Sequence, residues 1–177
     1  KEKGVLLVPA TGRLYRSLPE ALLDEQLSRY FILVNGAQVY DIRRDCAVSR
    51  AELPLEKTLR IMEYLDGFPV IYDCYMDNWG WITRSMQARA ADYITNPHSL
   101  YMARELRHPV DDLKAFLRER GQDVQKTQLF TADAGLRLQL LQEIGKKFEG
   151  LSISSSVSCN IEINDAHANK GEAIAAL

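Results

Sequence analysis

The first 41 residues of the chain alternate apolar runs with short polar turns. An apolar run over Val5 to Ala10 ends at Thr11-Gly12-Arg13, and a second run, Phe31 to Val34, ends at Asn35-Gly36. Between the two runs, residues 13–27 carry leucines at helical spacing. This order of strand, helix and strand predicts a βαβ unit whose two strands are parallel.

The pattern changes after Gly36, where continuous apolar runs give way to half-polar strands. Two pairs of short strands around polar turns predict two hairpins, and Trp79 lies at the tip of the second. Helices with one apolar stripe are expected to cover the sheet that these strands form. The predicted segments are hairpins over residues 37–50 and 70–84, helices over 55–65, 112–120 and 134–148, and a strand over 124–131.

Residues 151–164 show the clearest periodicity, because every second residue is polar and the residues between them are mostly apolar. Such alternation predicts a strand with one face on a core and the other on water or a wet cleft. The serines of the polar face, Ser152 to Ser158, could face solvent or lie near a substrate. Because 14 residues exceed the usual strand length, we expect this strand to turn a corner or to pass between domains.

Two further segments leave alternatives open. Residues 85–94 have helical spacing, Asn96-Pro97 interrupts it, and residues 100–107 fit a helix or a strand. Trp79 could close over a substrate, lie in a partner surface or face solvent at its turn.

Polar residues follow both apolar runs of the first βαβ unit at the point where each predicted strand ends. Ligands of parallel sheets gather at this edge, so Thr11-Gly12-Arg13 and Asn35-Gly36 are expected to lie together there. A glycine permits close approach, free backbone N–H groups donate, and an arginine fork matches phosphate. The sequence therefore predicts a phosphate ligand at this edge.

These residues also carry a resemblance to a known family. The sequence ATGR (Ala10 to Arg13), followed by NGA (Asn35 to Ala37) and later by NIEIND and NKGEAIAAL (Asn160 to Leu177), resembles the Cof-type branch of the haloacid dehalogenase (HAD) superfamily of phosphatases. The resemblance implies an α/β fold in which a partial Rossmann-like core, residues 1–35 and 164–177, holds an inserted α+β cap, residues 36–163. The cap is expected to be an open antiparallel sheet covered by helices on one face.

The resemblance implies hydrolysis of a small phosphorylated metabolite through an aspartyl-phosphate intermediate, with Mg²⁺ as cofactor of the full-length enzyme. Thr11 matches the hydroxyl that hydrogen-bonds the transferring phosphoryl group, and Lys170 matches the lysine that balances its charge. Gly12, Arg13, Asn35 and Gly36 would border the substrate. Each residue also has a plainer interpretation: Thr11 as a helix cap, Asn35-Gly36 as a turn, and Lys170 as a solvated lysine.

The sequence departs from the family pattern at both ends. The nucleophile motif DxDGT and the late acidic motif of the metal site are absent from the 177 residues, so the segment by itself is expected neither to hydrolyse phosphate nor to hold Mg²⁺ tightly. The expectation is therefore either a portion of a longer enzyme or a protein that has lost catalysis. Alternative functions are noncatalytic phospholigand binding and a protein-interaction surface on the same fold.

Composition narrows the classes of partner. A net charge of −2 with interspersed signs argues against nucleic acid, and no apolar run reaches membrane-spanning length. The three cysteines, Cys46, Cys74 and Cys159, lack the spacing of a disulfide framework or zinc site. We expect a cytoplasmic protein, monomeric or homodimeric.

Overall fold

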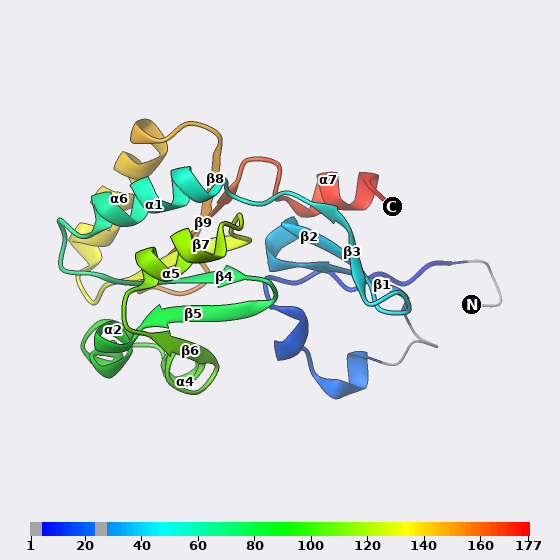
Figure 1. The fold of residues 1–177 in the computed structure, drawn as a ribbon, viewed down its shortest axis with the longest axis horizontal. Coiled ribbons are helices and arrows are strands. Elements are labelled where there is room, and N and C mark those ends of the chain that lie inside the picture. Colours follow the sequence, from blue (N-terminus) through cyan, green and yellow to red (C-terminus); the bar gives the residue numbers. More distant parts are fainter. Residues whose placement is uncertain (1–4, 24–27) are drawn as a thin grey trace.

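Two β-sheets organise the computed structural model, which describes residues 5–23 and 28–177 (Figure 1). Within these residues a three-stranded sheet has the order β1-β2-β3, and a six-stranded sheet has the order β6-β5-β4-β7-β9-β8. The strands are β1 (Tyr30–Leu33), β2 (Gln38–Asp41), β3 (Cys46–Arg50), β4 (Ile71–Met76), β5 (Trp79–Thr83), β6 (Arg107–Val110), β7 (Lys126–Phe130), β8 (Leu151–Ser154) and β9 (Asn160–Asp165).

The predicted strand over Val5 to Ala10 forms only a single parallel bridge, from Ala10 to Ile32 of β1. The predicted helix after it is also wrong in its described part, which contains two 3₁₀ helices, η1 (Tyr15–Ser17) and η2 (Glu20–Leu22); residues 24–27 lie outside the description. Pro19 explains the break. A residue before proline is driven out of the helical region, and Leu18 is extended at φ −75° and ψ 143°.

The first predicted hairpin is confirmed, but it belongs to the small sheet. β2 pairs antiparallel with both β1 and β3, so residues 38–50 continue the sheet of β1 and do not join the six-stranded sheet. The sequence placed these residues in the inserted cap, which was predicted to begin at residue 36. The division into core and cap remains a prediction.

The six-stranded sheet is antiparallel except for the parallel pair of β5 and β6. Helices α1 (Leu55–Leu65), α5 (Leu113–Arg120) and α6 (Ala134–Lys147) pack on one face through a large apolar cluster. A smaller cluster covers one end of the opposite face, where α3 (Ala90–Tyr93) and α4 (Pro97–Glu105) pack on Ile71 and Phe130. The short helix α2 (Arg84–Ala88) precedes them. The rest of this second face carries polar side chains together with Tyr75 and Ile82.

The alternating segment over residues 151–164 is a hairpin and not one long strand. β8 and β9 pair antiparallel with Ile153 opposite Ile163 and Ser154 opposite Glu162. Because even-numbered residues pair with even-numbered residues, the alternation continues unbroken through the turn. Asn160 closes this turn, since its Oδ1 accepts the N–H groups of Ser156 and Val157 at 3.0 and 3.1 Å.

The last element, α7 (Lys170–Ala175), confirms the predicted helix near the C-terminal end of the sequence. Asn169 caps it, since its Oδ1 accepts the N–H of Glu172 at 2.9 Å. No helix in the described part of the chain is long and apolar enough to cross a membrane. All three cysteines are free, with Cys74 and Cys159 buried.

Candidate functional site

Three segments far apart in the sequence meet at the turn after β1. Asn35 and Gly36 have positive φ angles of 65° and 112°, which turn the chain sharply between β1 and β2. A β-carbon added to Gly12 would lie 2.6 Å from Asn35 Oδ1, and one added to Gly36 would lie 2.5 Å from the carbonyl carbon of Asn169. The two glycines therefore permit the close packing that brings the ATGR, NGA and NKGEA segments together.

The six predicted site residues take different places around this turn. Gly12, Arg13 and Asn35 line a cavity, whereas Thr11, Gly36 and Lys170 are not among its lining residues. Thr11 accepts the backbone N–H of Arg13 on its Oγ1 at 3.2 Å, and its carbonyl accepts the N–H of Asn35 at 3.1 Å. Lys170 is exposed at the first position of α7, beside the Gly36 turn. The catalytic roles of Thr11 and Lys170 remain predictions.

The cavity has a volume of about 310 Å³ and lies between the ATGR–NGA region and the polar face of the six-stranded sheet. Its walls combine charged, amide, hydroxyl and apolar side chains. The lining residues are Gly12, Arg13, Asn35, Tyr75, His98, Ser99, Met102, Arg107, Lys126, Gln128, Phe130, Ser156, Asn160 and Glu162. Trp79 is not among them.

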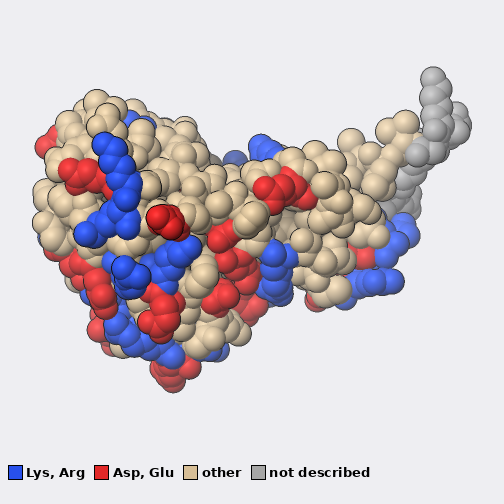
Figure 2. Space-filling view, turned by 90° about the horizontal axis from the view of Figure 1, so that it is seen from above, with Lys and Arg blue, Asp and Glu red and all other residues tan. Residues whose placement is uncertain are grey.

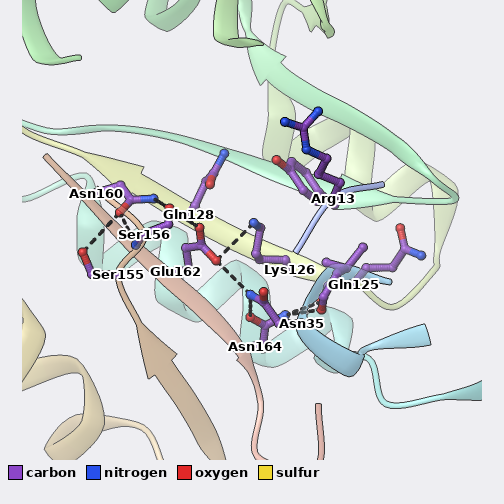
Figure 3. Close-up of polar contacts among 12 residues, drawn as sticks. Arg13, Asn35, Gln125, Lys126, Gln128, Ser155, Ser156, Asn160, Glu162 and Asn164 are labelled. Atoms are coloured by element: carbon purple, nitrogen blue, oxygen red, sulfur yellow. Dashed lines mark hydrogen bonds and ion pairs between the residues drawn. The ribbon is translucent and has the colours of Figure 1, made fainter. Parts of the chain in front are cut away.

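Glu162 on β9 is the centre of one hydrogen-bonded group in the cavity wall. Its Oε2 accepts from Asn35 Nδ2 at 2.8 Å and lies 3.4 Å from Lys126 Nζ, while its Oε1 accepts from Ser156 Oγ at 2.7 Å (Figure 3). Burial opposes ionisation of Glu162, but the charge of Lys126 and the hydrogen bonds outweigh it and lower the pKa of the carboxyl. This carboxylate therefore ties the turn at Asn35 to the sheet.

Asn164 strengthens the same connection. Its Oδ1 accepts from Asn35 Nδ2 at 3.1 Å, and its own Nδ2 donates to the carbonyl of Gln125 at 2.9 Å (Figure 3). Asn164 is 1% exposed, so these bonds are shielded from water. The position of Asn35 is thus determined by two residues of β9 as well as by its own turn.

A second set of hydrogen-bonded side chains lies on the sheet beside the set centred on Glu162. Asp73 of β4 is fully buried, and its Oδ2 accepts from Arg107 Nε at 2.8 Å and from Gln128 Nε2 at 3.0 Å. Arg107 also donates to Tyr75 Oη at 2.5 Å. Burial disfavours the charged guanidinium, but Asp73 and Tyr75 raise the pKa of Arg107, which stays cationic.

The sequence interpretation missed the polar residues that the strands contribute to this cavity. Lys126 and Gln128 of β7 face the same side of the sheet as Glu162 on β9. One signal was available: Asp73 lies inside the apolar run VIYDCYM, where a carboxylate requires a buried partner. The polar residues of 151–164 do reach the cavity at Ser156, Asn160 and Glu162.

Trp79, the tip residue of the second hairpin, lies elsewhere. Its ring stacks under the Arg16 guanidinium at 4.2 Å and meets the His108 ring edge-on at 4.6 Å. It lines a smaller cavity of about 180 Å³ that Arg16 and His108 also border. In this structure Trp79 joins the segment of η1 to the hairpin.

Within residues 5–23 and 28–177, no group of three or more His, Cys, Asp or Glu side chains lies close enough together to hold a metal ion. Magnesium sites need carboxylate and other oxygen ligands around the ion. The described residues therefore do not fit the Mg²⁺ that the resemblance implies, and the chemistry below uses only side chains that are present.

On the face in Figure 2, positive and negative side chains are intermixed.

Comparison with known proteins agrees with this geometry. The chain matches the model of the haloacid dehalogenase-like hydrolase family over residues 1–177, and it belongs to that family. A comparison with curated proteins gave no significant match.

Solved structures resemble the fold closely at low sequence identity. A haloacid dehalogenase-like hydrolase from B. subtilis has a TM-score of 0.73 at 17% identity, covering 98% of this chain and 66% of its own. A haloacid dehalogenase-like hydrolase from Bacteroides thetaiotaomicron gives 0.73 at 17% identity, covering 98% and 63%. A HAD subclass IIB sugar phosphatase gives 0.66 at 13% identity, covering 99% and 62%.

These likenesses confirm the predicted α/β fold class, and the match to the family model confirms the predicted family. The chain spans 62% to 66% of the length of the three solved structures described above.

Proposed function

We propose that this chain is the cap and central portion of a phosphatase that hydrolyses a small phosphorylated metabolite. The observation that carries the proposal is the cavity, in which Gly12, Arg13 and Asn35 face Lys126 and Arg107 of the sheet. Arginine and lysine side chains beside a glycine turn suit an anionic phosphoryl group. Family membership makes hydrolysis the reaction class, and the low identities leave the substrate to be found by experiment.

In this proposal the transferring phosphoryl group lies at the ATGR–NGA edge of the cavity. Thr11 donates its hydroxyl to a phosphoryl oxygen, and Lys170 balances the charge that builds up during transfer. Arg13 and Asn35 border the leaving group. A complete enzyme would add a nucleophilic aspartate, which would take the phosphoryl group as an aspartyl-phosphate while the alcohol leaves, and carboxylates that would hold Mg²⁺ to neutralise phosphoryl charge.

The proposal also divides the labour between a core and a cap. Residues 1–35 and 164–177 belong to the core that carries phosphoryl transfer, and residues 36–163 belong to the cap that selects the substrate. Cytoplasmic location and a monomeric or homodimeric state belong to the same proposal.

The test uses the complete protein, a panel of phosphorylated metabolites and Mg²⁺. Thr11→Ala and Lys170→Ala are each expected to lower kcat by roughly a hundredfold, the scale for removing one electrostatic stabiliser. Thr11→Ser, which keeps the hydroxyl, should restore part of the rate. Lys146→Ala, at an exposed lysine of α6, is the matched control and should turn over normally. Equal turnover in Thr11→Ala, Lys170→Ala and the unmodified protein would refute the assigned roles.

A further inference from the structure

Arg107 reaches the cavity by crossing a gap in the sheet surface. Along one row of paired residues, Arg107 of β6 lies opposite Gly80 of β5, Gly80 opposite Tyr75 of β4, and Tyr75 opposite Lys126 of β7. A β-carbon on Gly80 would lie 2.3 Å from Arg107 Cδ. The guanidinium can therefore pass over β5 only because residue 80 has no side chain.

Tyr75 separates two cations that approach it from neighbouring strands. The Arg107 guanidinium lies 4.5 Å from the centre of the Tyr75 ring, and Lys126 Nζ lies 4.4 Å from it. Both cationic side chains are almost fully buried, with 2% and 3% of their surface exposed. Arg107 donates from Nε to Asp73 Oδ2 at 2.8 Å and from Nη2 to Tyr75 Oη at 2.5 Å, so the carboxylate and the phenol together orient the guanidinium.

Lys126 has hydrogen-bond donors left over at this wall. Both oxygens of Glu162 already have partners, and Asn160 Oδ1 accepts from Ser155, Ser156 and Val157. Lys126 has three N–H donors, and its one polar partner among the described residues is Glu162. A ligand that accepts hydrogen bonds therefore fits beside Lys126.

The described cavity lining as a whole is positively charged. Its side chains include three cations, Arg13, Arg107 and Lys126, and one carboxylate, Glu162. Asp73 pairs with Arg107 and Glu162 with Lys126, so the positive charge left without a carboxylate is that of Arg13. Arg13 lies at the ATGR edge, where the phosphoryl group is placed above, whereas Arg107 and Lys126 lie on the sheet.

We propose that Arg107 and Lys126 bind a second anionic group, a carboxylate or a phosphate, on the part of the substrate that leaves. The inference rests on the proposed phosphatase function and deepens it. It predicts that substrates with a second anionic group besides the phosphate bind better than substrates whose leaving group is neutral. Asp73 and Gly80 are positioning residues: Asp73 orients the guanidinium and Gly80 leaves room for it.

The experiment measures binding without turnover. The complete protein in EDTA is titrated calorimetrically with two pairs of ligands, glucose 6-phosphate against 6-phosphogluconate and fructose 6-phosphate against fructose 1,6-bisphosphate. Each pair adds one anion, a carboxylate in the first and a phosphate in the second. We expect at least one doubly anionic member to bind about tenfold or more tightly than its partner, the scale of one charge-assisted hydrogen bond. The pair that shows the preference identifies the group.

Arg107→Gln should abolish this preference, since the energy of one charged hydrogen bond resides in the second anion. Arg107→Gln leaves the Asp73 carboxylate buried without its cation. The double variant Asp73→Asn/Arg107→Gln removes both charges of this pair and repeats the test without that buried charge. Gly80→Ala keeps every charge and should weaken the preference by displacing the guanidinium. Arg118→Gln, at an exposed arginine paired with Glu63 at 3.1 Å on the helix-covered side, is the control.

The outcomes separate this inference from the proposed function. Equal affinity within both pairs, or a preference that survives in Arg107→Gln and in the double variant, overturns the second-anion site. Hydrolysis of the singly anionic ligands with Mg²⁺ in that case still supports the phosphatase. An Arg107-dependent preference without phosphate release from any ligand supports the anion site and refutes the phosphatase.

Discussion

Gly36 and Asn169 are in backbone contact, although 132 positions separate them in the sequence (169 − 36 − 1). A β-carbon at Gly36 would come within 2.5 Å of the Asn169 carbonyl carbon and oxygen and 2.8 Å of its nitrogen. This contact joins the turn after β1 to the start of α7, and it places Lys170 next to the predicted phosphate-binding edge.

Gly36→Ala is therefore expected to destabilise the protein by at least about 2 kcal/mol, because it adds a backbone clash to an unfavourable φ of 112°. Gly121→Ala is a matched control, since Gly121 also has a positive φ, 62°, but has no atom within 4 Å of the added carbon. It should cost about 1 kcal/mol. Urea unfolding measures both. Similar losses at the two glycines would show that the Asn169 contact is not tight.

The sequence was a good guide where periodicity is strong. The helix at 55–65, the hairpin of β4 and β5, and α6 follow from local patterns that tertiary contacts then reinforce. The three motifs that meet at Gly36 could be found because each has a characteristic residue order. The contact of the third motif with the first two could be inferred only from the family resemblance, since nothing local in a sequence encodes a distance across more than a hundred residues.

Each prediction that was wrong or missed has a physical cause. Leucine spacing over residues 13–27 favours a helix, but Pro19 holds the preceding residue in an extended conformation. Even-numbered residues of β8 pair with even-numbered residues of β9. The alternation of polar and apolar residues therefore continues through the turn, and the sequence does not reveal the turn. Arg107 lies in a segment that fitted a helix or a strand, and its proposed role depends on Gly80 of β5, which pairs with it. The order of the strands in the sheet makes Gly80 and Arg107 neighbours, and the sequence patterns did not predict that order.

Asn169→Ala is expected to cost about 1 kcal/mol of stability, the usual value of an N-cap side chain. Asn169 accepts the N–H of Glu172, and Glu172 Oε1 accepts from Asn169 Nδ2, with both bonds at 2.9 Å. Asn169→Asp keeps an acceptor for the cap and should retain most of the stability. Because the cap orients the first turn of α7, Asn169→Ala should also lower kcat in the complete enzyme. Unchanged stability and unchanged kcat would argue that the helix begins without this cap.

Glu162→Gln is expected to lose stability at neutral pH and progressively less at acidic pH. The folded protein lowers the pKa of Glu162 below its ordinary value of 4.5, so the unfolded chain takes up a proton more readily. The stabilisation from this carboxylate is thus complete above about pH 4.5 and is lost as the pH falls through the lower folded pKa. Urea unfolding at several pH values should show the two proteins converging below about 4.5. Glu119→Gln, at an exposed position of α5, is the control, and a Glu162→Gln difference that stays constant with pH would contradict the prediction.

The buried pair of Asp73 and Arg107 should behave differently from a surface pair. Asp73→Ala leaves a buried guanidinium without its carboxylate and is expected to cost about 3 to 5 kcal/mol. Asp73→Asn/Arg107→Gln removes both charges together and should cost less than Asp73→Ala alone, because no uncompensated charge remains. Glu63→Ala, which breaks the exposed pair with Arg118, should cost no more than about 1 kcal/mol. Chemical denaturation of the three variants measures the comparison, and an equal loss for Asp73→Ala and Glu63→Ala would mean that Arg107 finds water or another partner when its carboxylate is removed.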